Sequence, residues 1–229
     1  MEHDTFEVRM EHLYGRQFNE RLARMPVGYL PMGTLERHGD HLPMGLDTLK
    51  AHGVCAHVAR RLGGIVWPAH HYLGIHQPGA ERAKLSTDWG NVYISEKLAL
   101  ETFEELLGRA AEIGFKVMVL YSGHYPVSQR DLLATVAAKE RADLKVLAYT
   151  ERDIFAGDGD HAGIWETSIL AALHPEWVRP ERLWELNYKQ HGWDAQHDPK
   201  KASLEFGFKA LETITIQISG DVYRALGRA

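Results

Sequence analysis

The chain has 229 residues, of which 45% are hydrophobic and 25% charged, the composition of an ordinary globular protein rather than a disordered one. We expect one domain over residues 1–229, and the formal charge of −5 argues against a nucleic-acid groove. Cys55 is the only cysteine, which excludes an internal disulfide and thiolate metal clusters. No run approaches the ~20 apolar residues of a membrane span, and residues 1–4 do not resemble a signal peptide, so we expect a cytoplasmic protein.

The first ninety residues show two helical and two strand-like patterns. Residues 9–24 space their apolar side chains for one helical face, and residues 27–32 form a short buried strand. A helix is predicted over 48–61 with Asp47 as its N-cap, followed by a strand over 65–67. The stretch 69–92 is the least regular, and we expect a loop there.

The rest of the chain continues the alternation of helix and strand. Helices are predicted over 95–113, 127–141 and 162–173, and strands over 117–121 and 144–149. Near the end, residues 213–218 alternate Thr and Ile with the period of a half-buried strand, and a short helix is expected after Gly220. This alternation predicts an α/β fold of three layers, α/β/α, with a mostly parallel central sheet.

Four loops, residues 33–46, 69–92, 122–126 and 150–161, follow predicted strands, and each carries histidine or carboxylate side chains. If the strands are parallel, these loops open at the same edge of the sheet, where α/β folds place their chemistry. Side chains that are distant in sequence would then converge at that edge.

Residues 31–47 hold the densest set of metal-ligand side chains, namely Glu36, His38, Asp47 and in addition His41. Carboxylate and imidazole groups are typical ligands of Zn, Mn and Fe. Glu36 and His38 alternate, so they point the same way in extended backbone, and the two oxygens of Asp47 could bridge ions ~3.5–4 Å apart. The alternative is a capping Asp47 beside a solvated Glu–His pair.

Three further polar residues belong to the later loops. His124 follows the predicted strand 117–121 and is either a ligand or an ordinary loop residue. His161 precedes the helix that carries Glu166, and we expect His161 and Glu166 to be the catalytic pair, with His161 as the acid/base. Glu166 could also be a metal ligand, or an exposed carboxylate that the helix dipole favours. Candidate substrate contacts from the same loops are His76, Arg82, Trp89 and Tyr125.

Three motifs resemble those of the creatininase (creatinine amidohydrolase) family. The segment 31–47, with Glu36-Arg-His38-Gly-Asp-His-Leu-Pro and then Asp47, is similar to the family signature. Ser122-Gly-His124 looks like its Asn-Gly-His loop, and His161-Ala-Gly-Ile-Trp-Glu166-Thr-Ser resembles its His-Ala-Gly-x-x-Glu-Thr-Ser segment. These matches occur in order across residues 27–170.

The resemblance implies a hydrolase with two divalent ions per chain, Zn, Mn or Fe, often in a homo-oligomer. It implies Glu36, His38, Asp47 and His124 as ligands, with Asp47 bridging and His161 moving protons. The expected substrate is a small molecule, either a cyclic amide or a compound with another non-peptide C–N bond. Creatinine-hydrolysing members carry a metal-binding Glu two residues after the loop His, where this chain has Pro126. The second ion must therefore lose a ligand, use Glu166 or bind weakly, and creatinine is not the expected substrate.

Two alternative functions remain open from the sequence. Some proteins of this resemblance are thought to open a cyclic diketone such as a keto-inositol by C–C hydrolysis, and a pocket rich in His, Arg and Gln would suit such a polyhydroxylated ligand. A non-catalytic member that binds a ligand is the other alternative, for which Pro126 is the main support.

Overall fold

The computed structural model describes residues 7–185 and 197–228. Within these residues the sheet has four strands in the order β2 (Ile65–Val66), β1 (Val27–Met32), β3 (Val117–Ser122) and β4 (Lys145–Tyr149). Every neighbouring pair is parallel, and the β1–β3 register runs from Val27 opposite Val117 to Met32 opposite Ser122. The predicted parallel sheet is confirmed, and the carboxyl ends of its strands lie at one edge.

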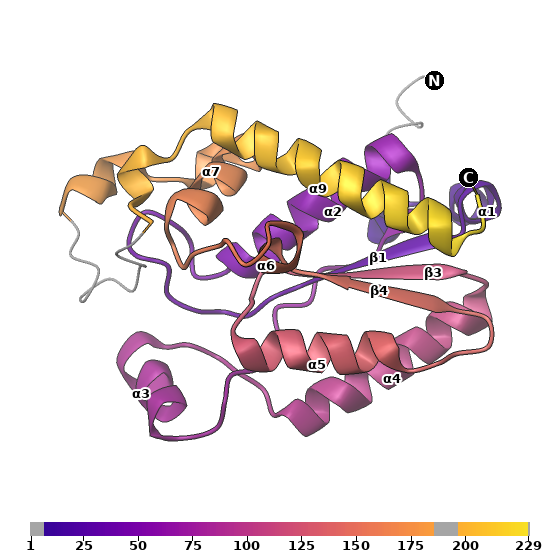
Figure 1. The fold of residues 1–229 in the computed structure, drawn as a ribbon, viewed down its shortest axis with the longest axis horizontal. Helices are drawn as coiled ribbons and strands as arrows, with labels where there is room; N and C mark the ends of the chain where they lie inside the picture. Colours follow the sequence, from indigo (N-terminus) through magenta and orange to yellow (C-terminus); the bar gives the residue numbers. More distant parts are fainter. Residues whose placement is uncertain (1–6, 186–196, 229) are drawn as a thin grey trace.

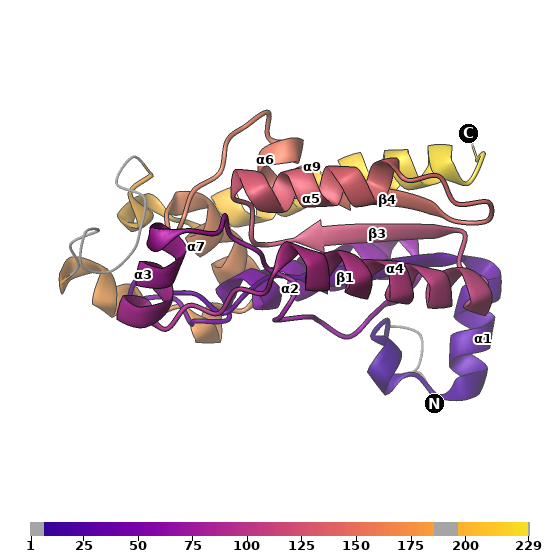
Figure 2. The same ribbon diagram turned by 90° about the horizontal axis from the view of Figure 1, so that it is seen from below.

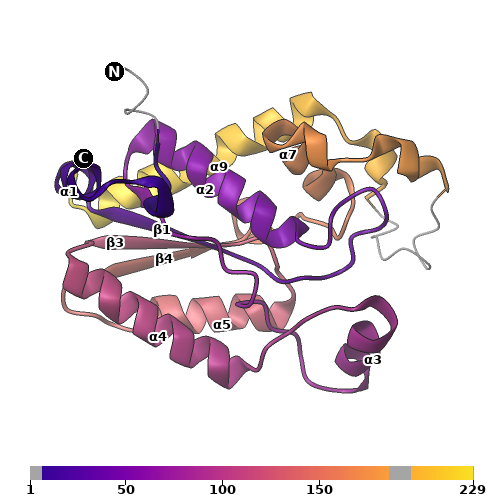
Figure 3. The ribbon, with the colours of Figure 1, turned by 180° about the vertical axis from the view of Figure 1, so that it is seen from behind.

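Helices cover both faces of this sheet (Figures 1 and 3). One face carries α2 (Leu46–Leu62), α7 (Ile164–Leu173) and α9 (Leu204–Ala225), and the other carries α4 (Glu96–Ile113) and α5 (Val127–Ala138). Strand side chains alternate between two cores: Val27 and Tyr29 pack toward α2 and α9, while Leu30 and Met32 pack toward α4 and α5. The three-layer α/β/α architecture is therefore confirmed.

Shorter elements complete the described chain. These are η1 (Met10–His12), α1 (Gly15–Arg24), α3 (Ala80–Trp89), α6 (Glu151–Ile154), η2 (Pro175–Trp177), η3 (Pro180–Glu185) and η4 (Pro199–Lys201). Figure 2 shows α3 and α7 at one end of the molecule, with α1 at the other end. None of the helices in the described ranges is long and apolar enough to cross a bilayer.

Three local predictions were wrong. Residues 213–218 are not a strand but part of α9, whose buried positions Gly207, Ala210, Leu211, Ile214, Ile218 and Val222 follow helical spacing. The stretch 69–92 contains the helix α3, which buries no residue. Asp47 is not an N-cap, because α2 begins at Leu46 after the N-cap Gly45 and the two oxygens of the Asp47 carboxylate lie beside His38 and His124.

Two glycines bring the strand ends against the start of α2. A Cβ on Gly33, directly after β1, would lie 2.4 Å from Cβ of Asp47, and one on Gly123, after β3, would lie 2.1 Å from the Asp47 carbonyl oxygen. Only glycine permits such close backbone approach. The first turn of α2 is thereby placed between the loops that follow β1 and β3.

Candidate metal centre

Five side chains predicted from separate segments meet at this edge of the sheet. Glu36 and His38 come from the loop after β1, Asp47 from α2, His124 from the loop after β3, and Glu166 from α7. All five are buried, with exposed fractions between 1% and 6%. His41, the additional candidate, is also buried but belongs to none of the ligand groups, and its Nε2 is 3.1 Å from Oγ1 of Thr167.

One group of three ligands consists of Glu36, Asp47 and His124. Nδ1 of His124 lies 3.0 Å from Oε1 of Glu36 and 3.2 Å from Oδ2 of Asp47. The other ring nitrogen, Nε2, lies 3.0 Å from the carbonyl oxygen of Ile75, to which it can donate. In the neutral imidazole that hydrogen bond assigns the proton to Nε2, so that Nδ1, which faces the two carboxylates, is the nitrogen that can bind a cation.

A second group consists of His38, Asp47 and Glu166. Nε2 of His38 lies 3.1 Å from Oδ1 of Asp47 and 3.5 Å from Oε2 of Glu166. Nδ1 of His38 is 3.0 Å from the carbonyl oxygen of Glu36, which leaves Nε2 free to bind a cation when Nδ1 carries the proton. Asp47 belongs to both groups, with one oxygen directed to each histidine.

The buried carboxylates of this cluster favour positive charge beside them. Burial raises the pKa of Glu36, but His124 outweighs that effect and holds this pKa well below its usual range. Burial lowers the pKa of His38 and His124, yet the carboxylates outweigh it and raise these values to about 9 and about 10. Nε2 of His38 and Oδ2 of Asp47 still make no directed hydrogen bond within the described residues. The donors and their charges fit two divalent ions that share Asp47.

A buried lysine that sequence reasoning missed neutralises the far side of the cluster. Nζ of Lys50 lies 2.8 Å from Oε1 of Glu166 and 3.1 Å from Oε1 of Glu151, and all three side chains are buried. The hydroxyl of Tyr125 is 3.0 Å from the same Glu166 oxygen. Oε2 of Glu166 accepts from the Ala162 N–H at 2.8 Å and faces His38. Glu166 is thus fixed in orientation, with one oxygen toward Lys50 and the other toward the candidate centre.

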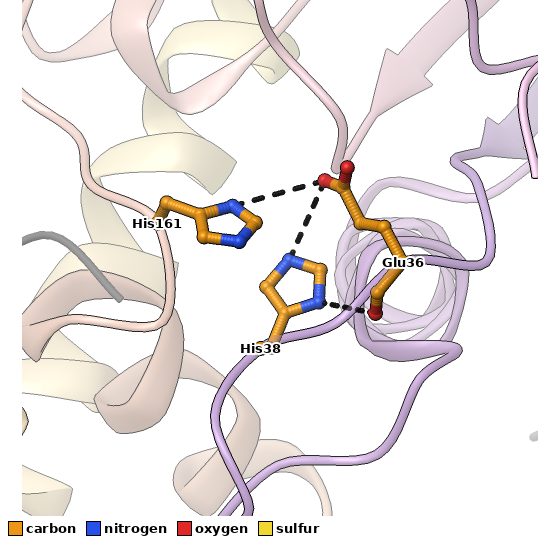
Figure 4. Close-up of side chains that lie close together, drawn as sticks. All are labelled: Glu36, His38 and His161. Atoms are coloured by element: carbon orange, nitrogen blue, oxygen red, sulfur yellow. Dashed lines mark hydrogen bonds and ion pairs between the residues drawn. The ribbon is translucent and has the colours of Figure 1, made fainter. Parts of the chain in front are cut away.

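Figure 4 shows His161 and His38 approaching the same Glu36 carboxylate. Nδ1 of His161 is 3.7 Å from Oε1 of Glu36, and its ring lies 4.3 Å from that of His38. Nε2 of His161 is 2.8 Å from the Arg37 carbonyl oxygen. Glu36, His38 and His161 form a third group of possible ligands, in which the His161 side chain is 39% exposed whereas the other two are buried. It lies between the cluster and the solvent.

The cluster opens into a cavity of about 430 Å³. Of the predicted substrate contacts, His76, Trp89 and Tyr125 line this cavity, whereas Arg82 does not. Sequence reasoning also missed several lining residues, among them the polar side chains of Asn91, Tyr93, Arg130 and Arg152. Tyr93 donates its hydroxyl to Oε2 of Glu36 at 2.7 Å and in turn accepts from Asn91. The signal for Tyr93 was weak, because an aromatic residue at a loop end is usually a packing residue.

Pro126 lies at the start of α5 and offers no ligand atom to the cluster. Glu166, which lines the same cavity as Pro126, supplies a carboxylate oxygen 3.5 Å from Nε2 of His38. The geometry therefore places a carboxylate beside His38 and Asp47 despite the proline. Glu166 therefore lies beside the cluster, as the sequence predicted, and it is not the exposed helix carboxylate of the alternative interpretation.

Comparison with known proteins gives a consistent result. The family model described as creatininase, creatinine amidohydrolase, matches residues 11–220. A creatinine amidohydrolase from Pseudomonas putida is 30% identical over 200 residues, covering 72% of this chain and 73% of that protein. A mycofactocin precursor peptide peptidase from Mycobacterium ulcerans is 28% identical over 69% of this chain, which spans only 62% of that relative.

A solved structure described as "Creatininase Mn" superposes with a TM-score of 0.68 at 25% identity, covering 95% of this chain and 98% of the other. The similarity in fold extends over almost the whole length of both chains. With a family match over nearly all of the described residues and the expected motifs gathered at one site, the chain belongs to the creatininase family of metal-dependent hydrolases.

Proposed function

We propose that this protein is an amidohydrolase whose site holds two divalent ions, Zn, Mn or Fe, at the buried cluster. The observation that carries the proposal is the pair of overlapping ligand groups that share Asp47. The names of both relatives, an amidohydrolase and a peptidase, describe hydrolysis of amide bonds. The solved neighbour described as a Mn form supports a metal of this class.

Each ligand group would hold one ion. Glu36, Asp47 and His124 supply the first set, and His38, Asp47 and Glu166 the second. When bound, such a pair of ions lowers the pKa of water toward neutrality and polarises a carbonyl oxygen. The Tyr93 hydroxyl donates to Glu36, while the carbonyl oxygens of Ile75 and Glu36 lie within hydrogen-bond distance of His124 and His38. These bonds fix the orientation of the ligands, an arrangement that strengthens metal binding.

His161 has the position of an acid/base. Its Nδ1 faces the centre near Glu36 while its ring remains partly exposed, so a proton can pass between the site and solvent. The bond from Nε2–H to the Arg37 carbonyl oxygen keeps Nδ1 directed inward. We assign to Nδ1 of His161 the delivery of a proton to the leaving nitrogen.

The substrate we propose is a small cyclic amide or a small molecule with another non-peptide C–N bond. A cavity of about 430 Å³ is of the size that small ligands occupy. Trp89 and Tyr93 offer aromatic surface there, and His76 offers a polar group. We do not expect creatinine itself to be the substrate, because Pro126 replaces a carboxylate that creatinine-hydrolysing members carry.

The test pairs metal content with hydrolysis. Asp47→Ala removes the shared ligand, and we expect the variant to lose both bound metal and hydrolysis of any lactam or formamide that the metal-loaded wild type cleaves. The exposed Asp143 provides a control, since Asp143→Ala should change neither. Undiminished hydrolysis by metal-free Asp47→Ala protein would refute the proposal. Retained ligand binding without hydrolysis in the wild type would favour a non-catalytic binding protein instead.

We also propose that the whole chain acts as one domain within a homo-oligomer. The exposed apolar side chains Phe208 and Ile216 on α9 could contribute to such an interface. Sedimentation velocity of the purified protein measures this directly. A sedimentation coefficient of a single chain at micromolar concentration would contradict the oligomer.

A further inference from the structure

Two guanidinium groups line the cavity, and they differ in their partners. Arg130 donates to Oδ1 of Asp153 from Nε at 3.1 Å and from Nη2 at 2.9 Å, so its charge is compensated. Arg152 donates to the carbonyl oxygen of Gly159 at 3.3 Å, and it forms no ion pair with a carboxylate of the described residues. The charge of Arg152 is therefore available to a ligand.

Arg152 lies one aromatic ring away from the candidate metal centre. Its Cζ is 5.8 Å from the centroid of the Tyr125 ring, and the hydroxyl at the far end of that ring is 3.0 Å from Glu166. Both Arg152 and Glu166 line the same cavity. A small molecule that reached the centre with its reacting carbonyl could therefore place a second group beside Arg152.

The remaining charges of the cavity do not cancel Arg152. Two divalent ions would more than neutralise the carboxylates of Glu36, Asp47 and Glu166. Asp160 also lines the cavity, and its two oxygens accept hydrogen bonds from the N–H groups of Trp165 and Glu166. With two divalent ions bound, the lining carboxylates would be balanced by the metal, and none of them would compensate the charge of Arg152.

We propose that the substrate is an amide that also bears a carboxylate, and that Arg152 binds this carboxylate while the amide carbonyl faces the metal centre. The inference rests on the proposed function and deepens it by naming the substrate class. The planar guanidinium matches a carboxylate with two parallel N–H donors, a geometry that lysine cannot reproduce. Trp89 and Leu85, which line the cavity from α3, would contact the apolar part of the substrate.

A purely structural role for Arg152 makes a different prediction. Its bond to Gly159 and its place beside Tyr125 could serve only to hold residues 155–160 against the sheet. In that case Arg152→Gln would impair the site for charged and neutral substrates alike. A carboxylate-binding Arg152 predicts a loss confined to the charged member of each substrate pair.

Matched amides provide the test. Dihydroorotate and dihydrouracil are cyclic amides that differ by one carboxylate, and N-acetylglycine and N-ethylacetamide are an acyclic pair. For the metal-loaded wild type we expect higher kcat/KM for the acid of a pair. In Arg152→Gln this advantage should fall about 10- to 100-fold, mainly through KM, the range expected for loss of a charged hydrogen bond. Arg152→Lys should restore only part of it. Arg109→Gln on the outer face of α4 is the control.

Equilibrium binding separates the two proposals. Calorimetry with dihydroorotate on metal-loaded wild type and Arg152→Gln measures recognition of the carboxylate without turnover. Hydrolysis of neutral and acidic amides with equal efficiency, or dihydroorotate binding that Arg152→Gln leaves unchanged, would overturn the carboxylate inference while the amidohydrolase proposal stands. Absence of hydrolysis with binding that still depends on Arg152 would refute the amidohydrolase proposal alone. Absence of both would overturn the inference.

Discussion

Replacing Lys50 tests the electrostatic design of the site. Lys50 is fully buried, and its ammonium lies 2.8 Å from Glu166 and 3.1 Å from Glu151. Burial lowers the pKa of Lys50, but the two carboxylates outweigh that effect and raise it. Lys50→Met keeps much of the volume and removes the charge. It leaves two buried carboxylates without their counter-ion.

The expected loss is large. Breaking a buried ion pair by removing one partner costs about 3–5 kcal/mol, and for a chain of this size each kcal/mol lowers Tm by about 2–4 °C. We therefore expect Lys50→Met to lower the Tm of metal-free protein by about 6–20 °C. The change is measured by thermal unfolding and by urea titration. In the exposed pair of Lys84 and Asp88, Lys84→Met should cost only about 0–1 kcal/mol.

Two further results would identify the cause as charge. The double variant Lys50→Met/Glu151→Gln should recover part of the lost stability, because one of the two buried carboxylates that lack a counter-ion has been replaced by a neutral amide. Added metal should recover another part, because a cation would face Glu166. A cost for Lys50→Met no larger than that for Lys84→Met would refute the reasoning. So would a double variant less stable than Lys50→Met alone.

Three other predictions concern the same edge of the sheet. His161→Gln should lower kcat about 100- to 10,000-fold while metal per chain stays unchanged, and a parallel loss of metal would instead make His161 a ligand. Gly123→Ala should lower the free energy of unfolding by about 1–3 kcal/mol and weaken metal binding, since the new Cβ meets the Asp47 carbonyl oxygen at 2.1 Å. The control is Gly108→Ala, whose Cβ would meet open space. Equal melting temperatures for the two variants would contradict this packing argument. Chelated protein should lose stability as the pH rises from about 6.5, the pKa of histidine in the unfolded chain. The loss should continue through about 9 and about 10, the pKa values of His38 and His124 in the folded protein. The reason is that groups with raised pKa values stabilise the fold only while they are protonated. Metal-loaded protein should lack that alkaline loss, and a flat Tm in chelated protein would argue against the charged cluster.

The site could be predicted in large part because its ligands follow strands. Glu36, His38 and His124 stand in loops directly after β1 and β3, and parallel topology alone brings such loops to one edge. Distances and partners were not predictable, since they depend on how α2 packs against Gly33 and Gly123. The family resemblance supplied the shared role of Asp47, which spacing alone left open.

Lys50 was missed although its position carried a signal. It belongs to the same helical stripe as Ala51, Val54 and Val58, which are all buried in α2. A lysine on an apolar stripe requires a buried acidic partner. That partner could not be named from sequence, because Glu151 and Glu166 lie on α6 and α7, more than a hundred residues further along the chain.

The error at residues 213–218 shows how local propensity is overridden. Thr and Ile favour strands over such a short window, but the longer pattern from Gly207 to Val222 has helical spacing. Ser203 accepts a hydrogen bond from the Phe206 N–H and caps the helix. Close contact of Gly207 with the Ser168 carbonyl oxygen then packs α9 on α7. Tertiary packing, which the short window does not contain, decides in favour of helix.

The most direct test of the central claim is the number of metal ions per chain. Protein purified without chelator and reconstituted with Zn, Mn or Fe is measured by elemental analysis, beside Asp47→Ala and Glu166→Gln. We expect about two ions per chain in the wild type, few in Asp47→Ala, and about one in Glu166→Gln, because Glu166 serves only the group with His38. Protein that binds no ion with any of the three metals would contradict the account.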